Sequence, residues 1–202
     1  MKQNERAFTF ATISLHFGMF MKVGNQTQRW SEIEFVCAYI VCFLIFVQFL
    51  IRYLAIIHLY DTETSLGSWL ASFLVLITSL VLIESTLHLP FWFLVFGLLL
   101  LLGALKTVQS IRRVKSAPMH DVERRLRLQE FMVMESAFGM FMILLYALTK
   151  TQWEKLPQLT YESSIFYGLL FALYYAVVST TIIILRILRN RAIINRHMKE
   201  SK

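Results

Sequence analysis

The chain has 202 residues, of which 57% are hydrophobic and 16% are charged, and its mean hydropathy is +0.58. Soluble domains contain about 45–50% apolar and about 25% charged residues, so this composition argues against a soluble globular protein and for a membrane protein. The net charge of +7 and the pI of about 9.6 do not by themselves indicate nucleic-acid binding, because Lys and Arg collect in the cytoplasmic loops of membrane proteins.

The first apolar stretch, residues 7–23, has two placements. It is apolar enough to touch lipid, but it is short for a span. Its polar side chains include Thr9, Thr12, Ser14 and His16. If it spans, the protein has six spanning helices and both termini inside; if it lies flat as an interfacial helix, there are five spans and an external N-terminus. We favour the interfacial placement, although Lys2 and Arg6 argue for an internal start.

Five later stretches approach or reach the roughly 20 mostly apolar residues that a spanning helix needs. They are residues 35–60, 68–87, 91–106, 131–149 and 165–188. Residues 68–105 are too long for one span at about 1.5 Å per residue, and Pro90 favours a sharp turn within them. The predicted fold class is therefore an all-α, polytopic membrane bundle with a tight hairpin at Pro90 and a single domain over residues 1–202.

Basic residues set the expected orientation, because short loops rich in Lys and Arg stay on the cytoplasmic side. The connection 106–130 contains seven Lys or Arg and the tail from Arg186 contains six, whereas loops 61–66 and 84–90 contain none. We therefore expect a multi-pass protein of the cell membrane whose connection 106–130 and C-terminal tail are cytoplasmic.

Helices are expected to continue from the membrane into this basic side. We expect Pro118 to end the first extension and Asp121 to be the N-cap of the next helix. Nine basic residues define the predicted surface: Arg112, Arg113, Lys115, Arg124, Arg125, Arg127, Arg189, Arg191 and Arg196. The headgroups of the lipid bilayer, an acidic cytosolic protein and nucleic acid are the partners to consider. Nucleic acid is disfavoured, because no base-stacking aromatic residues are interleaved with these charges.

Two charged residues fall inside predicted spans, where ionisable groups are costly and often functional. Arg52 lies in the inner part of its span, and Glu135 lies one turn into its span from the same side. Their similar depth predicts a salt bridge between Arg52 and Glu135. The alternative is that each side chain reaches the headgroups separately, and the sequence does not decide between the two.

Glu84 and His88 are four residues apart at the outer end of the second predicted span, so they are expected to share a helix face. A proton relay or a pH sensor can be built in this way, but we favour a polar cap on the hairpin turn. Two ligands are too few for a metal site, and we expect neither a metal nor another cofactor.

The last apolar stretch has a small residue at every fourth position. These residues are Gly168, Ala172, Ala176 and Thr180. Small residues on one face allow membrane helices to approach closely. The pattern predicts either an internal helix contact or the interface of a homo-oligomer.

Catalytic motifs are missing from the sequence, which has no Gly-rich phosphate loop, Gly-x-Ser-x-Gly, His-Glu-x-x-His or Cys-x-x-Cys. Ser–His chemistry can be assembled by the fold without a local motif, so an intramembrane enzyme acting on lipid is not excluded, but it ranks last. We expect a non-enzymatic, self-associating membrane subunit that couples the membrane to a cytosolic partner through its basic surface. Small membrane subunits of bacterial phage-defence and toxin-type systems share this general shape, although no motif connects the chain to either. The alternative is a small oligomeric ion channel or transporter with Arg52, Glu84 and Glu135 along its path.

Overall fold

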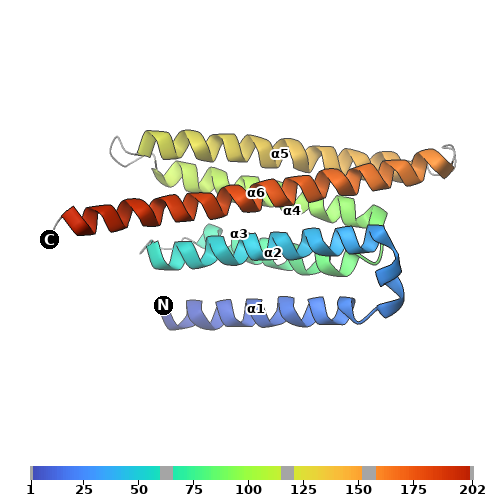
Figure 1. Cartoon of the computed structure of the whole chain (residues 1–202), viewed down its shortest axis with the longest axis horizontal. Helices are drawn as coiled ribbons and strands as arrows, with labels where there is room; N and C mark the ends of the chain where they lie inside the picture. Colours follow the sequence, from blue (N-terminus) through green and yellow to red (C-terminus); the bar gives the residue numbers. More distant parts are fainter. Residues whose placement is uncertain (1, 60–65, 115–120, 152–157, 201–202) are drawn as a thin grey trace.

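The computed structural model describes the backbone of residues 2–59, 66–114, 121–151 and 158–200 (Figure 1). Side chains are described for residues 10–51, 70–108, 129–150 and 162–185, apart from residues 27, 49, 71, 72 and 131. The helices of these ranges are α1 (Lys2–Gly24), the 3-10 helix η1 (Thr27–Ser31), α2 (Ile33–Leu59), α3 (Leu66–Ser85), α4 (Leu89–Val114), α5 (Asp121–Thr151) and α6 (Gln158–Glu200). No strand occurs in the ranges given, so the all-α prediction is confirmed.

The six α-helices lie side by side in one elongated bundle (Figure 1). Helix α4 packs against α5 and α3, α2 packs against α6, and α1 packs against α3. Three helices contain stretches long and apolar enough to cross a membrane: Leu89–Val108, Met132–Lys150 and Glu162–Leu185. These confirm three of the five predicted spans as candidate membrane helices.

The other two predicted spans correspond to α2 and α3. Their described apolar parts, Ile33–Gln48 and Phe73–Ser85, are shorter than a span, because the residues that adjoin them lie outside the described side chains. These two spans stay predictions.

The hairpin expected at Pro90 is present. Helix α3 ends at Ser85 and α4 begins at Leu89, and the turn between them is closed by a bond from the backbone N–H of His88 to the carbonyl of Ser85 (2.8 Å). Pro90 lies in the first turn of α4, where a missing backbone N–H is tolerated and the fixed φ of proline suits a helix.

The position of helix α1 bears on the two placements of residues 7–23, and both stay predictions. The helix runs alongside the other helices, with its N-terminus at the same end of the bundle as the C-terminus of α6 (Figure 1), whereas an interfacial helix would lie across the bundle axis. Two of the polar residues that argued against a span, Thr12 and His16, are only 3% and 1% exposed. Helix α1 buries these groups against its neighbours, and its direction matches the spanning alternative.

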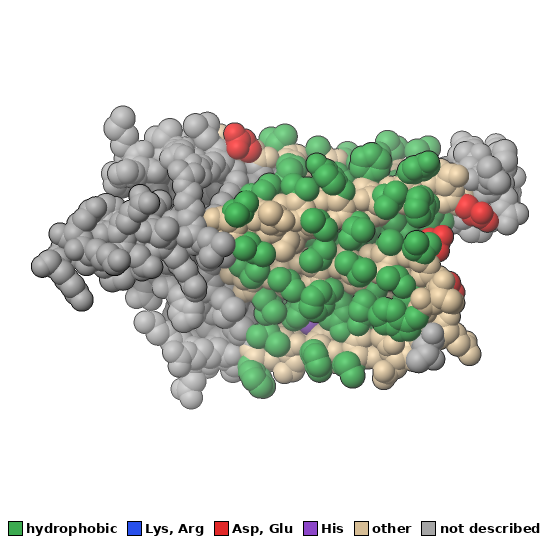
Figure 2. All heavy atoms as spheres, in the orientation of Figure 1, with side chains coloured by type: hydrophobic (Ala, Val, Ile, Leu, Met, Phe, Trp, Pro, Cys, Tyr) green, Lys and Arg blue, Asp and Glu red, His purple; other side chains and the backbone are tan. Residues whose placement is uncertain are grey.

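The described outer surface of the bundle is mostly apolar. Figure 2 shows hydrophobic side chains over the whole middle of this face, with the visible acidic side chains near its two ends. The exposed large residues come from different helices and include Phe17, Ile77, Met140, Leu144 and Tyr174. Apolar surface on this scale is far more than a soluble monomer exposes, and it is what a bundle surrounded by lipid requires.

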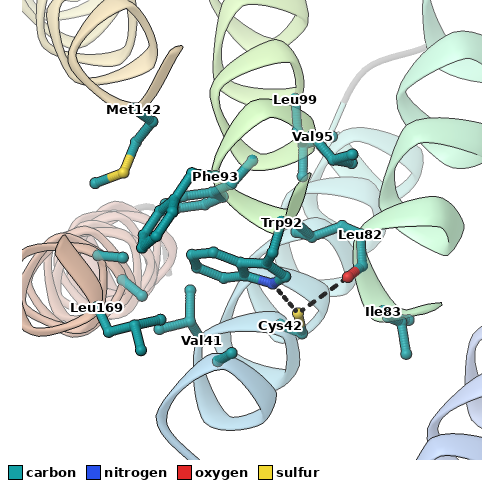
Figure 3. Close-up of a cluster of buried hydrophobic side chains, with 14 of the residues drawn as sticks. Val41, Cys42, Leu82, Ile83, Trp92, Phe93, Val95, Leu99, Met142 and Leu169 are labelled. Carbon is teal, nitrogen blue, oxygen red and sulfur yellow. Dashed lines mark hydrogen bonds between the residues drawn. The ribbon is translucent and has the colours of Figure 1, made fainter. Parts of the chain in front are cut away.

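The centre of the bundle is a packed core to which α2, α3, α4, α5 and α6 all contribute (Figure 3). Trp92 and Phe93 of α4 are fully buried among Met142 of α5 and Leu169 of α6. The indole N–H of Trp92 donates to the sulfur of Cys42 on α2 (3.3 Å). A buried tryptophan needs such a partner for its N–H, so Cys42 packs in the core and also satisfies that group.

Candidate functional site

The segments of the chain that are rich in Lys and Arg lie at one end of the bundle, which we call the basic end. Helices α1 and α5 begin there, and α4 and α6 finish there (Figure 1). The predicted basic residues fall on the helices that meet at this end: Arg112 and Arg113 on α4, Arg124, Arg125 and Arg127 on α5, and Arg189, Arg191 and Arg196 on α6. Their side chains, and Lys115, lie outside the described residues. The backbone alone therefore brings these segments of the sequence to one end of the molecule.

Helix α6 is longer than a membrane span needs to be. Its 43 residues make about 64 Å at 1.5 Å per residue, against roughly 30 Å of hydrocarbon in a bilayer. The described apolar part of α6 is Glu162–Leu185, and residues 186–200 continue the helix for about 22 Å. This extension contains Arg189, Arg191 and Arg196.

Glu135 is a buried carboxylate between α4 and α5, and it is 3% exposed. A Cβ added to Gly103 of α4 would lie 3.3 Å from both of its carboxylate oxygens. The hydroxyl of Thr107 makes a long contact of 3.5 Å with Oε2 of Glu135 and donates to the carbonyl of Gly103 over 3.0 Å. Glycine at position 103 thus makes room for the carboxylate inside the bundle. The side chain of Arg52 on α2 lies outside the described residues, so the Arg52–Glu135 salt bridge stays a prediction.

Glu84 and His88 do not share a helix face, because α3 ends at Ser85 and His88 lies in the turn before α4. Glu84 instead forms an ion pair with Lys22 of α1, with 2.8 Å between Nζ and Oε1. The backbone carbonyl of His88 accepts the N–H of Trp92 (3.0 Å), and its side chain is exposed. The premise of a Glu84–His88 relay on one helix face is therefore wrong.

The small-residue face of α6 is an internal contact. Ala172 and Ala176 are fully buried and Thr180 is 7% exposed. A Cβ added to Gly168 would collide with Leu145 of α5 and would lie 3.0 Å from the ring of Phe93 on α4. These contacts place the face against α4 and α5 within the chain, and self-association stays a prediction.

Gln48 joins α2 to α6, and the sequence reasoning did not single it out. Its side-chain NH₂ donates to the carbonyl of Ala176 (3.1 Å) and to the hydroxyls of Ser179 (2.7 Å) and Thr180 (2.9 Å). Polar side chains often join membrane helices in this way. A signal existed in the sequence, because Gln48 interrupts an apolar run and Ser179 and Thr180 interrupt another.

A second buried polar contact, also missed, joins α1 to α3. His16 of α1 is 1% exposed, and its Nε2 lies 2.7 Å from the hydroxyl of Ser79 on α3. Its Nδ1 lies 2.8 Å from the carbonyl of Thr12. The signal was the spacing of four between Thr12 and His16, which places both on one face of a helix.

Neither a metal-binding cluster nor a similar known protein indicates a function for these residues. Among the described side chains, no group of three or more His, Cys, Asp or Glu is placed to hold a metal ion. The chain matches no protein-family model, no curated protein and no solved structure.

Proposed function

We propose that this chain is a non-enzymatic membrane subunit whose bundle, α1 included, spans the cell membrane and presents the basic end to the cytosol. The observation that supports the proposal is the convergence of α4, α5 and the overlong α6 at that end (Figure 1). Lys and Arg resist translocation, so an end with this many basic residues is expected on the cytoplasmic side. The C-terminus and, with α1 spanning, the N-terminus would then both be cytoplasmic.

An acidic cytosolic protein fits the basic end better than lipid headgroups alone. The headgroup layer adds only about 5–7 Å on each side of the hydrocarbon. Arg196 is 8 residues beyond Leu188, where the predicted span 165–188 ends, which places its backbone about 12 Å past that span in a helix that follows the membrane normal. Headgroups can contact Arg189, whereas Arg196 projects past them to where a soluble protein can bind.

An ion channel or transporter within one chain is less well supported. Large side chains fill the middle of the described bundle, where Trp92, Phe93 and Phe96 are all fully buried. Glu135 lies between α4 and α5 against Gly103, and Glu84 pairs with Lys22 at the end opposite the basic end. These positions give the two carboxylates separate packing roles instead of a common path.

Self-association is not needed for this proposal. It was expected from the small-residue face of α6, and that face packs inside the chain. A phage-defence or toxin-type setting, suggested by the general shape of the protein, would have to come from the identity of the cytosolic partner.

The test is a charge-dependent capture from the native host in mild detergent. The first variant changes Arg189, Arg191 and Arg196 to Gln, and the matched control changes Lys22 and Arg29, which lie at the opposite end, to Gln. We expect the first variant to lose an acidic soluble protein that the unchanged chain and the control both retain. Equal capture by all three proteins, or no soluble protein with any of them, would overturn the proposal.

A further inference from the structure

The contact between α1 and α3 contains polar groups that the proposed function does not use. We call it the polar seam, and it consists of Thr12, His16 and Lys22 of α1 with Ser79 and Glu84 of α3. Lys22 and Glu84 close it as an exposed ion pair, and His16 lies about 9 Å deeper along α1. At that depth Thr12, His16 and Ser79 are 3%, 1% and 8% exposed. The polar seam therefore extends from the solvent-exposed Lys22–Glu84 ion pair to the buried imidazole of His16.

His16 is held on three sides. Its Nδ1 lies 2.8 Å from the carbonyl of Thr12 and its Nε2 lies 2.7 Å from the hydroxyl of Ser79. The ring stacks on Phe46 of α2, with 4.7 Å between the centroids and 15° between the planes. The hydroxyl of Ser79 also lies 2.7 Å from the carbonyl of Leu76.

These contacts are satisfied in two protonation states. In the neutral state, Nδ1–H donates to Thr12 and the Ser79 hydroxyl donates to the bare Nε2. In the protonated state, Nδ1–H still donates to Thr12, Nε2–H donates to Ser79, and the Ser79 hydroxyl turns to donate to Leu76. Carbonyl oxygens only accept and a hydroxyl both donates and accepts, so the change needs one O–H rotation and no shift of a heavy atom.

We propose that His16 and Ser79 form a reversible proton-binding site inside the bundle. Burial penalises the charged imidazolium. Two hydrogen bonds to the charged ring and the stacked face of Phe46 act against that penalty. Among the side chains, histidine is the one whose ordinary titration lies closest to physiological pH, so acidification is the condition under which we expect this site to take up a proton.

The charged and titratable neighbours of His16 are few within the described part of α1, α2 and α3. Lys22 and Glu84 form the ion pair at the mouth of the seam, so their charges largely cancel at His16. On α2, the hydroxyl of Tyr39 donates to the carbonyl of Phe20 (3.1 Å), and the thiol of Cys42 faces the carbonyl of Leu82 (3.8 Å). The described hydrogen bonds of His16 are those to Ser79 and to the carbonyl of Thr12.

The proposal is tested by ¹⁵N spectra of the full chain in lipid bilayers, labelled at its five histidines, over about pH 4–8. The signal absent from His16→Gln identifies His16. We expect that signal to change reversibly from one protonated and one bare nitrogen to two protonated nitrogens as the pH falls. A bare nitrogen that persists across the range, or loss of the bundle before His16 takes up a proton, would overturn the proposal.

A matched pair of variants separates a proton site from a structural contact. Ser79→Ala removes the oxygen that accepts from Nε2–H, and Ser79→Thr keeps it. Ser79 bonds to His16 in both states, but a hydrogen bond to a charged group is the stronger one. We therefore expect the ratio of protonated to neutral His16 to fall severalfold in Ser79→Ala and to be nearly unchanged in Ser79→Thr. The same ratio in all three proteins would show that Ser79 has no part in proton binding. This result is independent of partner capture at the basic end.

Discussion

Gly97 of α4 and Gly139 of α5 face each other where the two helices cross. A Cβ added to Gly97 would lie 2.7 Å from the carbonyl oxygen of Gly139, and a Cβ added to Gly139 would lie 3.0 Å from the carbonyl oxygen of Gly97. Each backbone therefore occupies the space that a side chain on the other would need. Close contact of this kind is how membrane helices gain packing energy when lipid surrounds them.

Gly97→Ala is expected to destabilise the bundle. The new methyl group meets backbone, which cannot move aside as a flexible side chain can, so we expect a loss of about 1–3 kcal/mol in the free energy of unfolding. Gly18→Ala is the control, because a Cβ there meets nothing within 4 Å and alanine favours a helix by up to about 1 kcal/mol. Denaturation in detergent measures both variants. A Gly97→Ala protein as stable as the Gly18→Ala protein would contradict the close crossing.

Gln48→Leu is expected to have a small effect. The side chain loses three described contacts to α6, but interhelical hydrogen bonds in membranes average only about 0.6 kcal/mol. Ser179 and Thr180 keep their bonds to the carbonyls of Tyr175 (2.7 Å) and Ala176 (2.6 Å), so neither is left unsatisfied. We expect a loss of about 1 kcal/mol in unfolding experiments. A loss several times larger would mean that Gln48 has a further role.

Gly103→Val and Glu135→Ala are expected to be coupled. The valine occupies the space beside the carboxyl group of Glu135, 3.3 Å from an added Cβ, and should force that buried group to move. In Glu135→Ala the obstructing carboxylate is gone, so Gly103→Val should be milder in that background. A double-mutant cycle on unfolding should give an interaction energy above about 0.5 kcal/mol. Strict additivity would contradict the contact.

Both ends of the chain are expected on the same side of the membrane. In Figure 1 the N-terminus of α1 and the C-terminus of α6 lie at the same end of the bundle. If all six helices span, the chain crosses the membrane an even number of times and both ends lie on one side. Single cysteines replacing Gln3 and Ser201, in a chain without Cys37 and Cys42, should react with an impermeant label from the cytoplasmic side. A cysteine replacing Gln28 is the control and should react from the other side. Labelling of positions 3 and 28 from one side would restore the interfacial placement of α1.

The sequence predicted the helices well and their partners poorly. Length and hydropathy were enough to place α4, α5 and α6, because a span needs about 20 apolar residues wherever it lies in the chain. Gly97 and Gly139 lie in different apolar helices, and nothing local shows that they meet. The regular spacing from Gly168 to Thr180 did identify a packing face, but whether that face was internal depended on α4 and α5.

The direction in which polar side chains point could not be predicted from the sequence. Thr12 and His16 lowered the apolar content of α1 and so favoured the interfacial placement, yet both point inward. Glu84 and His88 were expected on one helix face, but α3 stops at Ser85. There the hydroxyls of Ser85 and Thr86 bond back to the carbonyls of Leu82 (2.8 Å) and Ile83 (2.7 Å), which satisfies groups that a helix end leaves open.

The most direct test of the proposed function is the mass of the complex purified in mild detergent from its native host, measured by native mass spectrometry with the bound proteins identified. We predict the chain together with an acidic soluble protein that is lost when Arg189, Arg191 and Arg196 are changed to Gln. The chain alone, or only copies of itself, would contradict a coupling function and would direct attention to ion flux.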